Sequence, residues 1–409
     1  MPPLDSDAPL GGDGTATRPN RAPVMAFVTE AETEAALREG LQDAMPEGFE
    51  FRRASVRAAA AMLSGMPTPL TLILDLSGEE NPLVALADLS QVVEPDVRVL
   101  VVGEREDVNF YRQVTRGLGA LEYLYKPLIR DMVARHFGPL LSRQALAQNA
   151  VHGGRMVTVT GVRGGVGAST VSANLAWYLG VEAKRHTVLL DTDLHRGTCA
   201  MLLGAKSGSG LRTALETPDR IDELFVERAA QPLAERLHVL AGEEQLTEQP
   251  AYAAGGAARL SDALRRRYNF VVADLPFTGQ PLHRDLMNLT QQRVLVMLPT
   301  LASVRDTLRL LALPNGPAQP RRAVVVLNRA GMPGGLDACR VADALKMQPD
   351  VVIPDVKRAV ERAASLGTPA AQERGAFRNG MMALAREVGF TRREAEPPLL
   401  RRGLLRWRK

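Results

Sequence analysis

Short apolar runs alternate with helical stretches along most of the 409-residue chain. Runs such as LTLILDL and VRVLVVG are continuous, which is typical of strands buried on both faces of a parallel sheet. Five such runs fall in the N-terminal third, at 24–28, 49–55, 70–76, 97–103 and 121–125. Their alternation with helices predicts an α/β unit over residues 24–145, with a five-stranded parallel sheet covered on both faces.

A second series of apolar runs begins after a glycine-containing connector at residues 146–155. The runs are MVTVTG, TVLLD, RLHVLAG, FVVADLP, RVLVMLP, AVVVLNR and VVIP. They predict a larger, doubly wound and mostly parallel sheet over residues 156–390. Residues 1–23 are rich in proline, glycine and aspartate with little to bury, so we expect a disordered tail there. Residues 391–409 form a second, basic tail.

The first run of the larger sheet leads into a glycine-rich turn and then a helix, in the segment MVTVTGVRGGVGASTVSANLA. Gly164, Gly165 and Gly167 allow backbone N–H groups to approach phosphates closely, and the helix that follows directs its positive end at the same point. Ser169 is placed to ligate Mg²⁺, and Thr170 to bond a phosphate oxygen. A tight structural turn would explain the glycines alone equally well.

Carboxylates end two other runs of this sheet. TVLLDTD supplies Asp191 and Asp193, and FVVADLP supplies Asp274. A single carboxylate at a strand end is often only a helix cap. Several of them beside a glycine loop favour a site for a Mg²⁺-nucleotide complex, because Mg²⁺ prefers oxygen ligands.

The segment RGGVGAST, residues 163–170, resembles the deviant phosphate loop KGGxGK[ST] of the MinD/ParA family of ATPases. Arg163 stands at the family's signature lysine, Val166 at the variable position and Ala168 at the loop lysine. The resemblance implies binding of ATP and Mg²⁺ by this loop, and a homodimer in which the signature residue reaches the partner's nucleotide. It implies further that Asp191 helps to orient the attacking water and the magnesium shell, with Asp193 and Asp274 on the metal side.

Two later strand ends resemble the base-binding edges of the same family. VVVLNR ends in Asn328 and Arg329, and VVIPDVK supplies Pro354 and Asp355. Ordinary strand-to-helix turns account for the same residues, because asparagine, proline and aspartate suit turns. Nucleotide contact and turn chemistry both stay open for these positions.

The alanine at position 168 changes what the loop is expected to do. A loop lysine places its charge on the β and γ phosphates, where charge concentrates as the bond breaks. Its loss should therefore slow hydrolysis more than it weakens binding. One charge-assisted hydrogen bond is worth about 1.5–3 kcal/mol, or about one to two decades in affinity, so ATP binding is still expected. Arg163 retains a cation suited to phosphate, which favours a long-lived, ATP-bound dimer.

The N-terminal unit resembles a response-regulator receiver domain of the flavodoxin-like class. Asp75 ends the third run where a receiver has its phosphoacceptor, and Lys126 precedes a proline after the fifth run. The adjacent acidic pair that would hold Mg²⁺ is absent after the first run, where Thr29 and Glu30 stand, and Gly103 replaces the usual hydroxyl residue. We therefore expect a docking unit in which Asp75 is not phosphorylated.

A receiver-like unit placed before a MinD/ParA-like core, in this order, resembles the CpaE/TadZ proteins. Those proteins are assembly and localisation factors for type IVb (Flp/Tad) pili on the cytoplasmic side of the inner membrane. The resemblance covers about residues 24–390 and implies partners in the pilus secretion machinery and a polar location.

Composition supports a chain made and kept in the cytoplasm. The N-terminus lacks the basic start and apolar core of a signal peptide, and no run of about 18 apolar residues occurs. The two cysteines, Cys199 and Cys339, are too few for a disulfide framework, and we expect both to be small buried residues.

The net charge of +4 is concentrated in the last residues. Residues 392–409 contain seven basic and two acidic residues, which gives +5 and leaves −1 for the remainder. The globular part is therefore not basic, and we expect no specific nucleic-acid partner. Within the tail, residues 397–409 place leucines and a tryptophan opposite arginines, a pattern that suits an anionic membrane surface or a solvated basic end.

Two alternatives remain beside a pilus factor that uses ATP as a dimerisation ligand. An active partitioning ATPase of the MinD/ParA type is opposed by Ala168 and by the lack of a basic core surface. A signalling protein switched by phosphorylation of Asp75 is opposed by the missing acidic pair.

Overall fold

The structure is a computed structural model that describes residues 21–44, 49–95, 97–141, 154–248, 250–319 and 321–389. The predicted N-terminal tail therefore lies outside the described residues up to position 20, and the predicted linker lies outside them up to position 153. The basic tail at 391–409 also lies outside them. Arg21 belongs to the folded part, because its guanidinium donates to the Thr68 carbonyl at 2.6 Å and pairs with Glu94 at 3.0 Å.

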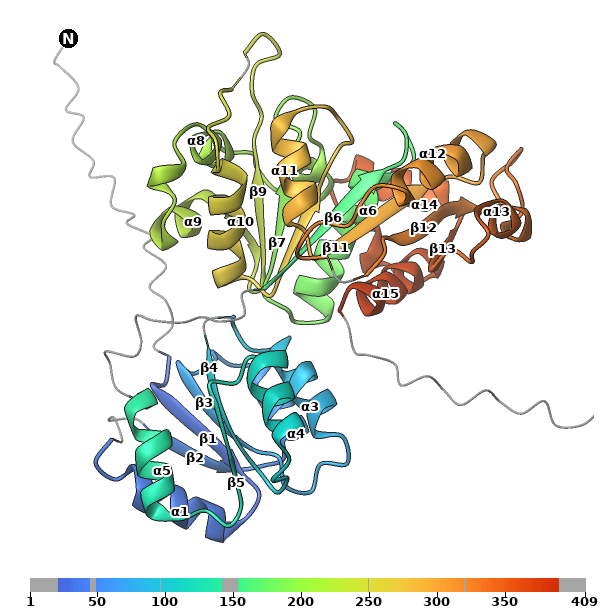
Figure 1. Cartoon of the computed structure of the whole chain (residues 1–409). Helices are drawn as coiled ribbons and strands as arrows, with labels where there is room; N and C mark the ends of the chain where they lie inside the picture. The colour runs from blue at the N-terminus through green and yellow to red at the C-terminus, as the bar shows by residue number, and fades with distance from the viewer. Residues whose placement is uncertain are drawn as a thin grey trace, which may run out of the picture.

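The N-terminal unit contains a fully parallel five-stranded sheet in the order β2-β1-β3-β4-β5 (Figure 1). This is the order of flavodoxin-like doubly wound folds. The central strands β1 and β3 are buried at every position, as their continuous apolar runs predict. The strands are β1 (Val24–Val28), β2 (Glu50–Arg53), β3 (Thr71–Asp75), β4 (Arg98–Gly103) and β5 (Glu122–Tyr125).

Helices cover both faces of this sheet. Helices α1 and α5 pack together on one face, and α2 packs with α3 on the other, so the unit has an apolar core on each side. Ser55 and Asp107 begin two of the helices by accepting hydrogen bonds from the first free backbone N–H groups. The helices are α1 (Ala31–Leu41), α2 (Val56–Leu63), α3 (Pro82–Ser90), α4 (Val108–Arg112) and α5 (Arg130–His136).

The C-terminal unit contains an eight-stranded sheet in the order β13-β12-β11-β6-β10-β7-β9-β8. All of its pairings are parallel except that of β8 with β9. The predicted α/β class, with a larger, mostly parallel sheet after a smaller one, is confirmed. The strands are β6 (Arg155–Gly161), β7 (Thr187–Asp191), β8 (Gln231–Ala234), β9 (Leu237–Ala241), β10 (Phe270–Asp274), β11 (Gln292–Met297), β12 (Val324–Ala330) and β13 (Val351–Pro354).

Two apolar cores flank the larger sheet, as the doubly wound pattern predicts. Helices α6 and α15 pack against each other over one core, and α10 packs with α8 and α11 over the other. The helices are α6 (Ala168–Trp177), α7 (Cys199–Leu202), α8 (Gly210–Glu216), α9 (Glu223–Ala229), α10 (Gly256–Arg267), α11 (Pro281–Leu289), α12 (Leu301–Leu311), α13 (Ala338–Leu345), α14 (Lys357–Ser365) and α15 (Ala376–Gly389).

A buried arginine joins the two units. Arg236 stands immediately before β9, is 4% exposed, and donates to the carbonyls of Leu63 at 3.0 Å and Val92 at 3.4 Å. These carbonyls lie at or just beyond the C-terminal ends of α2 and α3, where helices leave acceptors unpaired and favour a cation. Asn269, immediately before β10, donates to the carbonyl of Val93 at 2.6 Å. The N-terminal unit thus docks at the amino ends of β9 and β10, the edge opposite to the phosphate loop.

We predict that Arg236→Ala loosens this contact between the units. The substitution leaves buried carbonyls without their donor, which costs about 3 kcal/mol. Urea unfolding should show the loss, and limited proteolysis should cleave the variant faster within residues 142–153.

Arg266→Ala is the matched control, because Arg266 is an exposed arginine of α10. It should leave both measurements at the wild-type value. An Arg236→Ala protein as stable and as protease-resistant as the control would show that the arginine does not hold the units together.

Candidate functional site

The glycine-rich turn joins the carboxyl end of β6 to the start of α6. Gly165 and Gly167 have φ values of 78° and 92°, a region that side chains with a Cβ atom rarely adopt. A Cβ atom on Gly167 would also lie 2.7 Å from the side-chain nitrogen of Asn328. The turn therefore needs glycine at these positions and exposes its backbone at the start of α6.

A pocket of about 520 Å³ opens over this turn. It gathers residues from the turn, the loop after β7 and the segment after β10, which meet because parallel strands end at one edge. The lining residues are Gly161, Val162, Arg163, Gly164, Gly165, Val166, Gly167, Ala168, Ser169, Thr170, Asp193, Arg196, Gly197, Asp274, Leu275, Pro276 and Phe277. The sequence-predicted loop residues and two of the three predicted carboxylates therefore share one pocket.

Asp191 is not among the lining residues. Its side chain is buried, and one oxygen accepts from the backbone N–H of Cys199 at 2.9 Å, while the other accepts from that of Asp193 at 3.2 Å. Gly197 packs so closely that a Cβ atom there would lie 2.5 Å from the Asp191 carboxylate. In this structure Asp191 anchors the loop that follows β7, and the loop brings Asp193 to the pocket.

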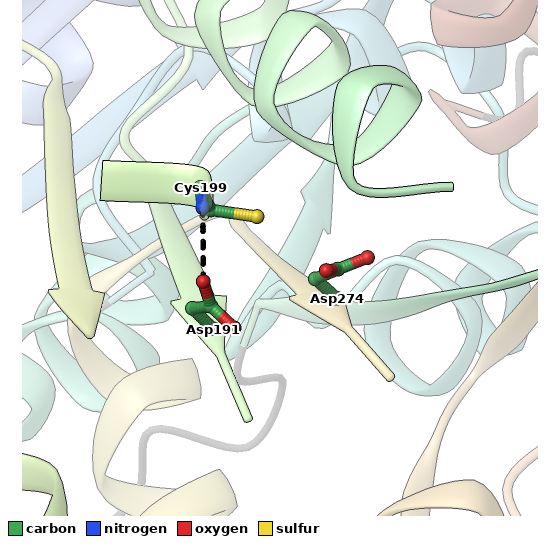
Figure 2. A group of neighbouring side chains, drawn as sticks. All are labelled: Asp191, Cys199 and Asp274. Atoms are coloured by element: carbon green, nitrogen blue, oxygen red, sulfur yellow. Dashed lines mark hydrogen bonds between the residues drawn. The ribbon is translucent and has the colours of Figure 1, made fainter. Parts of the chain in front are cut away.

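Burial dominates the electrostatics at the ends of β7 and β10. It raises the pKa of Asp191 to about 6, with the nearby charge of Asp274 acting in the same direction. Burial also raises the pKa of Asp274. The pKa of the Cys199 thiol lies well above its ordinary value because of burial and the two carboxylates. Figure 2 shows these three side chains gathered where β7, β10 and α7 meet, with their ligand atoms within 4.8 Å of one another.

The donors around Asp274 fit a hard divalent cation. Ser172 donates its hydroxyl to Asp274 at 2.8 Å, and the Ser169 hydroxyl favours the ionised form of the same carboxylate. Ser169, Asp193 and Asp274 offer oxygen atoms at the same pocket, the ligand type that Mg²⁺ prefers. A cation there would also relieve the cost of ionising the buried carboxylate. Ser172 was missed from the sequence, although its position one helical turn after Ser169 could have indicated it.

The predicted base-contacting residues lie outside this pocket. Asn328 is buried, and its side-chain amide donates to the carbonyl of Val166 at 2.9 Å while its oxygen accepts from the Arg329 backbone N–H. Asn328 therefore secures the turn from behind. Arg329 pairs with Asp355 at 3.1 Å, where β12 and β13 end, and Pro354 closes β13.

Arg163 is held by an acid that sequence reasoning missed. Its guanidinium lies 2.6 Å from a carboxylate oxygen of Asp306 on α12, and its side chain is 45% exposed. Asp306 also pairs with Arg305 at 2.9 Å. Arg163, the cation at the signature position of the predicted phosphate loop, thus has an ion-pair partner within its own chain, at the rim of the pocket.

Arg196 is a second basic side chain that the sequence analysis missed. It stands on the loop after β7 and lines the pocket beside Asp193. Its position three residues after a predicted magnesium-side carboxylate was the only available signal, and an exposed arginine in a loop is too common to stand out.

The two cysteines differ from each other. Cys199 is buried, as predicted, whereas Cys339 is exposed, so the prediction that both are buried is wrong. Cys339 follows Ala338 at the start of α13, and the buried residues of that helix begin at Val341. One side of this amphipathic helix faces the core, and Cys339 falls on the other side.

Asp75 of the N-terminal unit is fully buried at the end of β3. One carboxylate oxygen accepts from the Thr29 hydroxyl at 2.8 Å and lies 3.1 Å from the Lys126 amine; the other accepts from the Ser77 hydroxyl at 2.6 Å. Burial opposes ionisation, but these hydrogen bonds and the lysine hold the pKa of Asp75 below its ordinary value. Lys126 also pairs with Glu30 at 2.6 Å. Both oxygens of Asp75 are thus engaged by the protein itself.

Comparison with known proteins places the C-terminal unit in a fold group. No family model matches the chain. A putative septum site-determining protein MinD of Guillardia theta is 29% identical over 162 residues, which is 39% of this chain and 58% of that protein. The crystal structure of a ParA family ATPase from Chlorobium tepidum covers 57% of this chain and 98% of its own, with a TM-score of 0.52 and 18% identity. The C-terminal unit has the fold of the ParA and MinD ATPases.

The crystal structure of a pilus assembly protein CpaE from Caulobacter crescentus is 31% identical over 29% of this chain and 91% of its own, with a TM-score of 0.26. The chain spans 58% of the length of the curated MinD relative. Among the described residues, no helix has the length and hydrophobicity needed to cross a membrane.

We predict that Asp75→Ala destabilises the N-terminal unit by about 1–3 kcal/mol at pH 7, because it leaves the Thr29 and Ser77 hydroxyls without their buried acceptor and removes one of the two carboxylates that pair with Lys126. The folded-state pKa of Asp75 lies below the unfolded value of about 3.9. The contribution of the ionised carboxylate to the free energy of unfolding is therefore complete above that pH, and it declines as the pH falls through the folded-state pKa. Urea unfolding should show a smaller difference in the free energy of unfolding between the variant and wild type at about pH 3 than at pH 7.

Asp131→Ala provides the control, because Asp131 is exposed on α5. It should match wild type at both pH values. A stable Asp75→Ala protein, or labelling of Asp75 by acetyl phosphate, would contradict a structural role for this carboxylate.

Proposed function

We propose that the chain is an ATP-binding localisation and assembly factor for a type IVb (Flp/Tad) pilus system, at the cytoplasmic side of the inner membrane. ATP acts mainly as a dimerisation ligand, and hydrolysis is weak or absent. The observation that carries the proposal is a pocket with the phosphate turn, a hydroxyl and two carboxylates in place, but with Ala168 where the loop cation is expected.

Within this proposal, the backbone of residues 163–170 holds the phosphates of ATP and Thr170 bonds a phosphate oxygen. Ser169, Asp193 and Asp274 hold Mg²⁺, in part through water. The bound Mg²⁺ supplies positive charge to the phosphates. Arg329, Pro354 and Asp355 form the edge that faces the base, while Asn328 supports the turn through Val166.

Slow turnover follows from two features of the site. Ala168 offers no charge to the phosphates as the bond breaks, and this is the stage at which a preorganised cation contributes most. Asp191, the proposed orienting residue for water, has both oxygens occupied by backbone N–H groups of its own loop. Water activation by Asp191 would require that loop to rearrange.

Dimerisation by ATP is proposed to use Arg163. In a two-fold sandwich this arginine crosses to the nucleotide of the second copy and grips its phosphates bidentately. Arg163 must first leave Asp306, which lies 2.6 Å away. The exchange of the Asp306 carboxylate for a phosphate makes the dimer dependent on the nucleotide.

The pilus assignment is based on the order of the two units, a receiver-like unit before a MinD/ParA-like one. The N-terminal unit serves as a docking unit for the secretion machinery, and its engaged Asp75 is consistent with a role without phosphorylation. Residues 397–409 lie on the anionic inner membrane, and the protein collects at a cell pole. No specific nucleic acid is involved.

We predict that Mg²⁺-ATP doubles the mass of the full chain in light scattering, whereas ADP does not, and that phosphate release stays near background. Arg163→Ala should prevent the mass increase. Arg305→Ala is a matched control that removes a different arginine from Asp306, and it should dimerise as wild type does.

Two results would contradict the proposal. Turnover comparable to that of MinD-type enzymes, lost in Asp191→Ala, would replace this proposal with an active partitioning ATPase. An Arg163→Ala protein that still dimerises would remove Arg163 from the interface.

We predict further that deletion of the gene abolishes Flp-type pili, and that Arg163→Ala fails to restore them while Arg305→Ala restores them. Electron microscopy of the cells and a fluorescent fusion give the two measurements, pilus number and polar location. Normal piliation in the deletion strain would contradict the pilus assignment and leave nucleotide binding untouched.

A further inference from the structure

The phosphate pocket lacks a positively charged side chain at position 168, where Ala168 stands. The charged side chains that line it are the carboxylates of Asp193 and Asp274 and the guanidinium groups of Arg163 and Arg196. A nucleotide adds several negative charges to the two carboxylates. Because the start of α6 offers backbone N–H groups and hydroxyls but no cationic side chain, a cation from another segment must reach the phosphates for tight binding.

Arg163 is poorly available for the nucleotide of its own chain. It makes a 2.6 Å ion pair with Asp306, whose side chain is only 15% exposed. Among the residues that the structure describes, Arg196 has no ion pair as short as that of Arg163. Its guanidinium lies 4.0 Å from the nearest oxygen of Asp193, at the limit of an ion pair, and its side chain is 83% exposed. Turning toward the pocket therefore costs Arg196 little.

The backbone at position 196 is nevertheless well fixed. The Asp193 carboxylate accepts from the backbone N–H of Arg196 at 3.0 Å, and the Asp193 carbonyl accepts from that of Gly197 at 2.9 Å. Gly197 in turn packs against Asp191, where any Cβ atom would collide. The loop thus presents a long, free cationic side chain from an anchored base at the pocket rim.

We propose that Arg196 supplies the positive charge that position 168 lacks and binds the nucleotide phosphates of its own chain. A guanidinium suits this role because its planar donors can bond two phosphate oxygens at once. In this arrangement the cation of the site stands on the loop after β7, next to the Asp193 carboxylate, and not at the start of α6. This inference rests on the proposed nucleotide function.

Binding of Mg²⁺-ATP by calorimetry to the full chain tests the proposal. Arg196→Ala should weaken affinity by about tenfold to one hundredfold, the loss expected for one charge-assisted contact. Arg196→Lys should recover part of it. Arg340→Ala is the matched control, because Arg340 is 75% exposed, pairs with an aspartate three residues before it, and lies outside the pocket. It should bind as wild type does.

A restored loop lysine provides the sharper comparison. In an Ala168→Lys background, removal of Arg196 should cost less than about threefold, because the lysine now supplies the same charge. An equal loss in both backgrounds, or an Arg196→Ala protein that binds within about twofold of wild type, would overturn the proposal. Far-UV circular dichroism confirms that each variant is folded.

The same measurements distinguish a failure of the role proposed for Arg196 from a failure of the proposed nucleotide function. If wild type fails to bind but Ala168→Lys binds, Arg196 does not replace the lysine and the nucleotide site still stands. If neither binds while both are folded, the nucleotide function itself is wrong, and the role of Arg196 is overturned with it.

Discussion

The parallel direction of β6, β7 and β10 is the constraint on which the site depends. The register pairs Asp274 directly with Asp191 and with Val159 of β6, so the turn after β6 and the loops after β7 and β10 must share one edge. No single segment builds the pocket. The N-terminal unit attaches through Arg236 and Asn269 at the opposite edge, so it leaves the phosphate turn open.

The pocket combines a backbone turn with two carboxylates, and from this arrangement we propose that it holds an anion beside a cation. Positive φ values at Gly165 and Gly167 open the turn, and the side chain of Asn328 holds it from behind. Burial makes ionisation of Asp274 costly, so a bound cation and a bound phosphate favour each other at this edge.

Much of this architecture could be predicted from the sequence because it depends on local patterns. Continuous apolar runs indicate buried parallel strands, and glycines before a helix indicate a turn that exposes N–H groups. The short antiparallel strand β8, which contains Pro232, has no such pattern and was not predicted. The roles of Asn328 and Asp306 depend on contacts between residues more than 140 positions apart. Asp191 belongs to the expected set of strand-end acids, but the fold turns it toward its own loop.

The central claim is that the turn binds phosphate through its backbone without a loop lysine. Glycine-selective ¹⁵N labelling and TROSY spectra of the full chain, recorded with and without Mg²⁺-ATP, test it most directly. We expect the amide signals of Gly164, Gly165 and Gly167 to shift on saturation, while those of Gly78 and Gly119 in the N-terminal unit stay in place. Loop amides that remain unmoved at saturating Mg²⁺-ATP would contradict it.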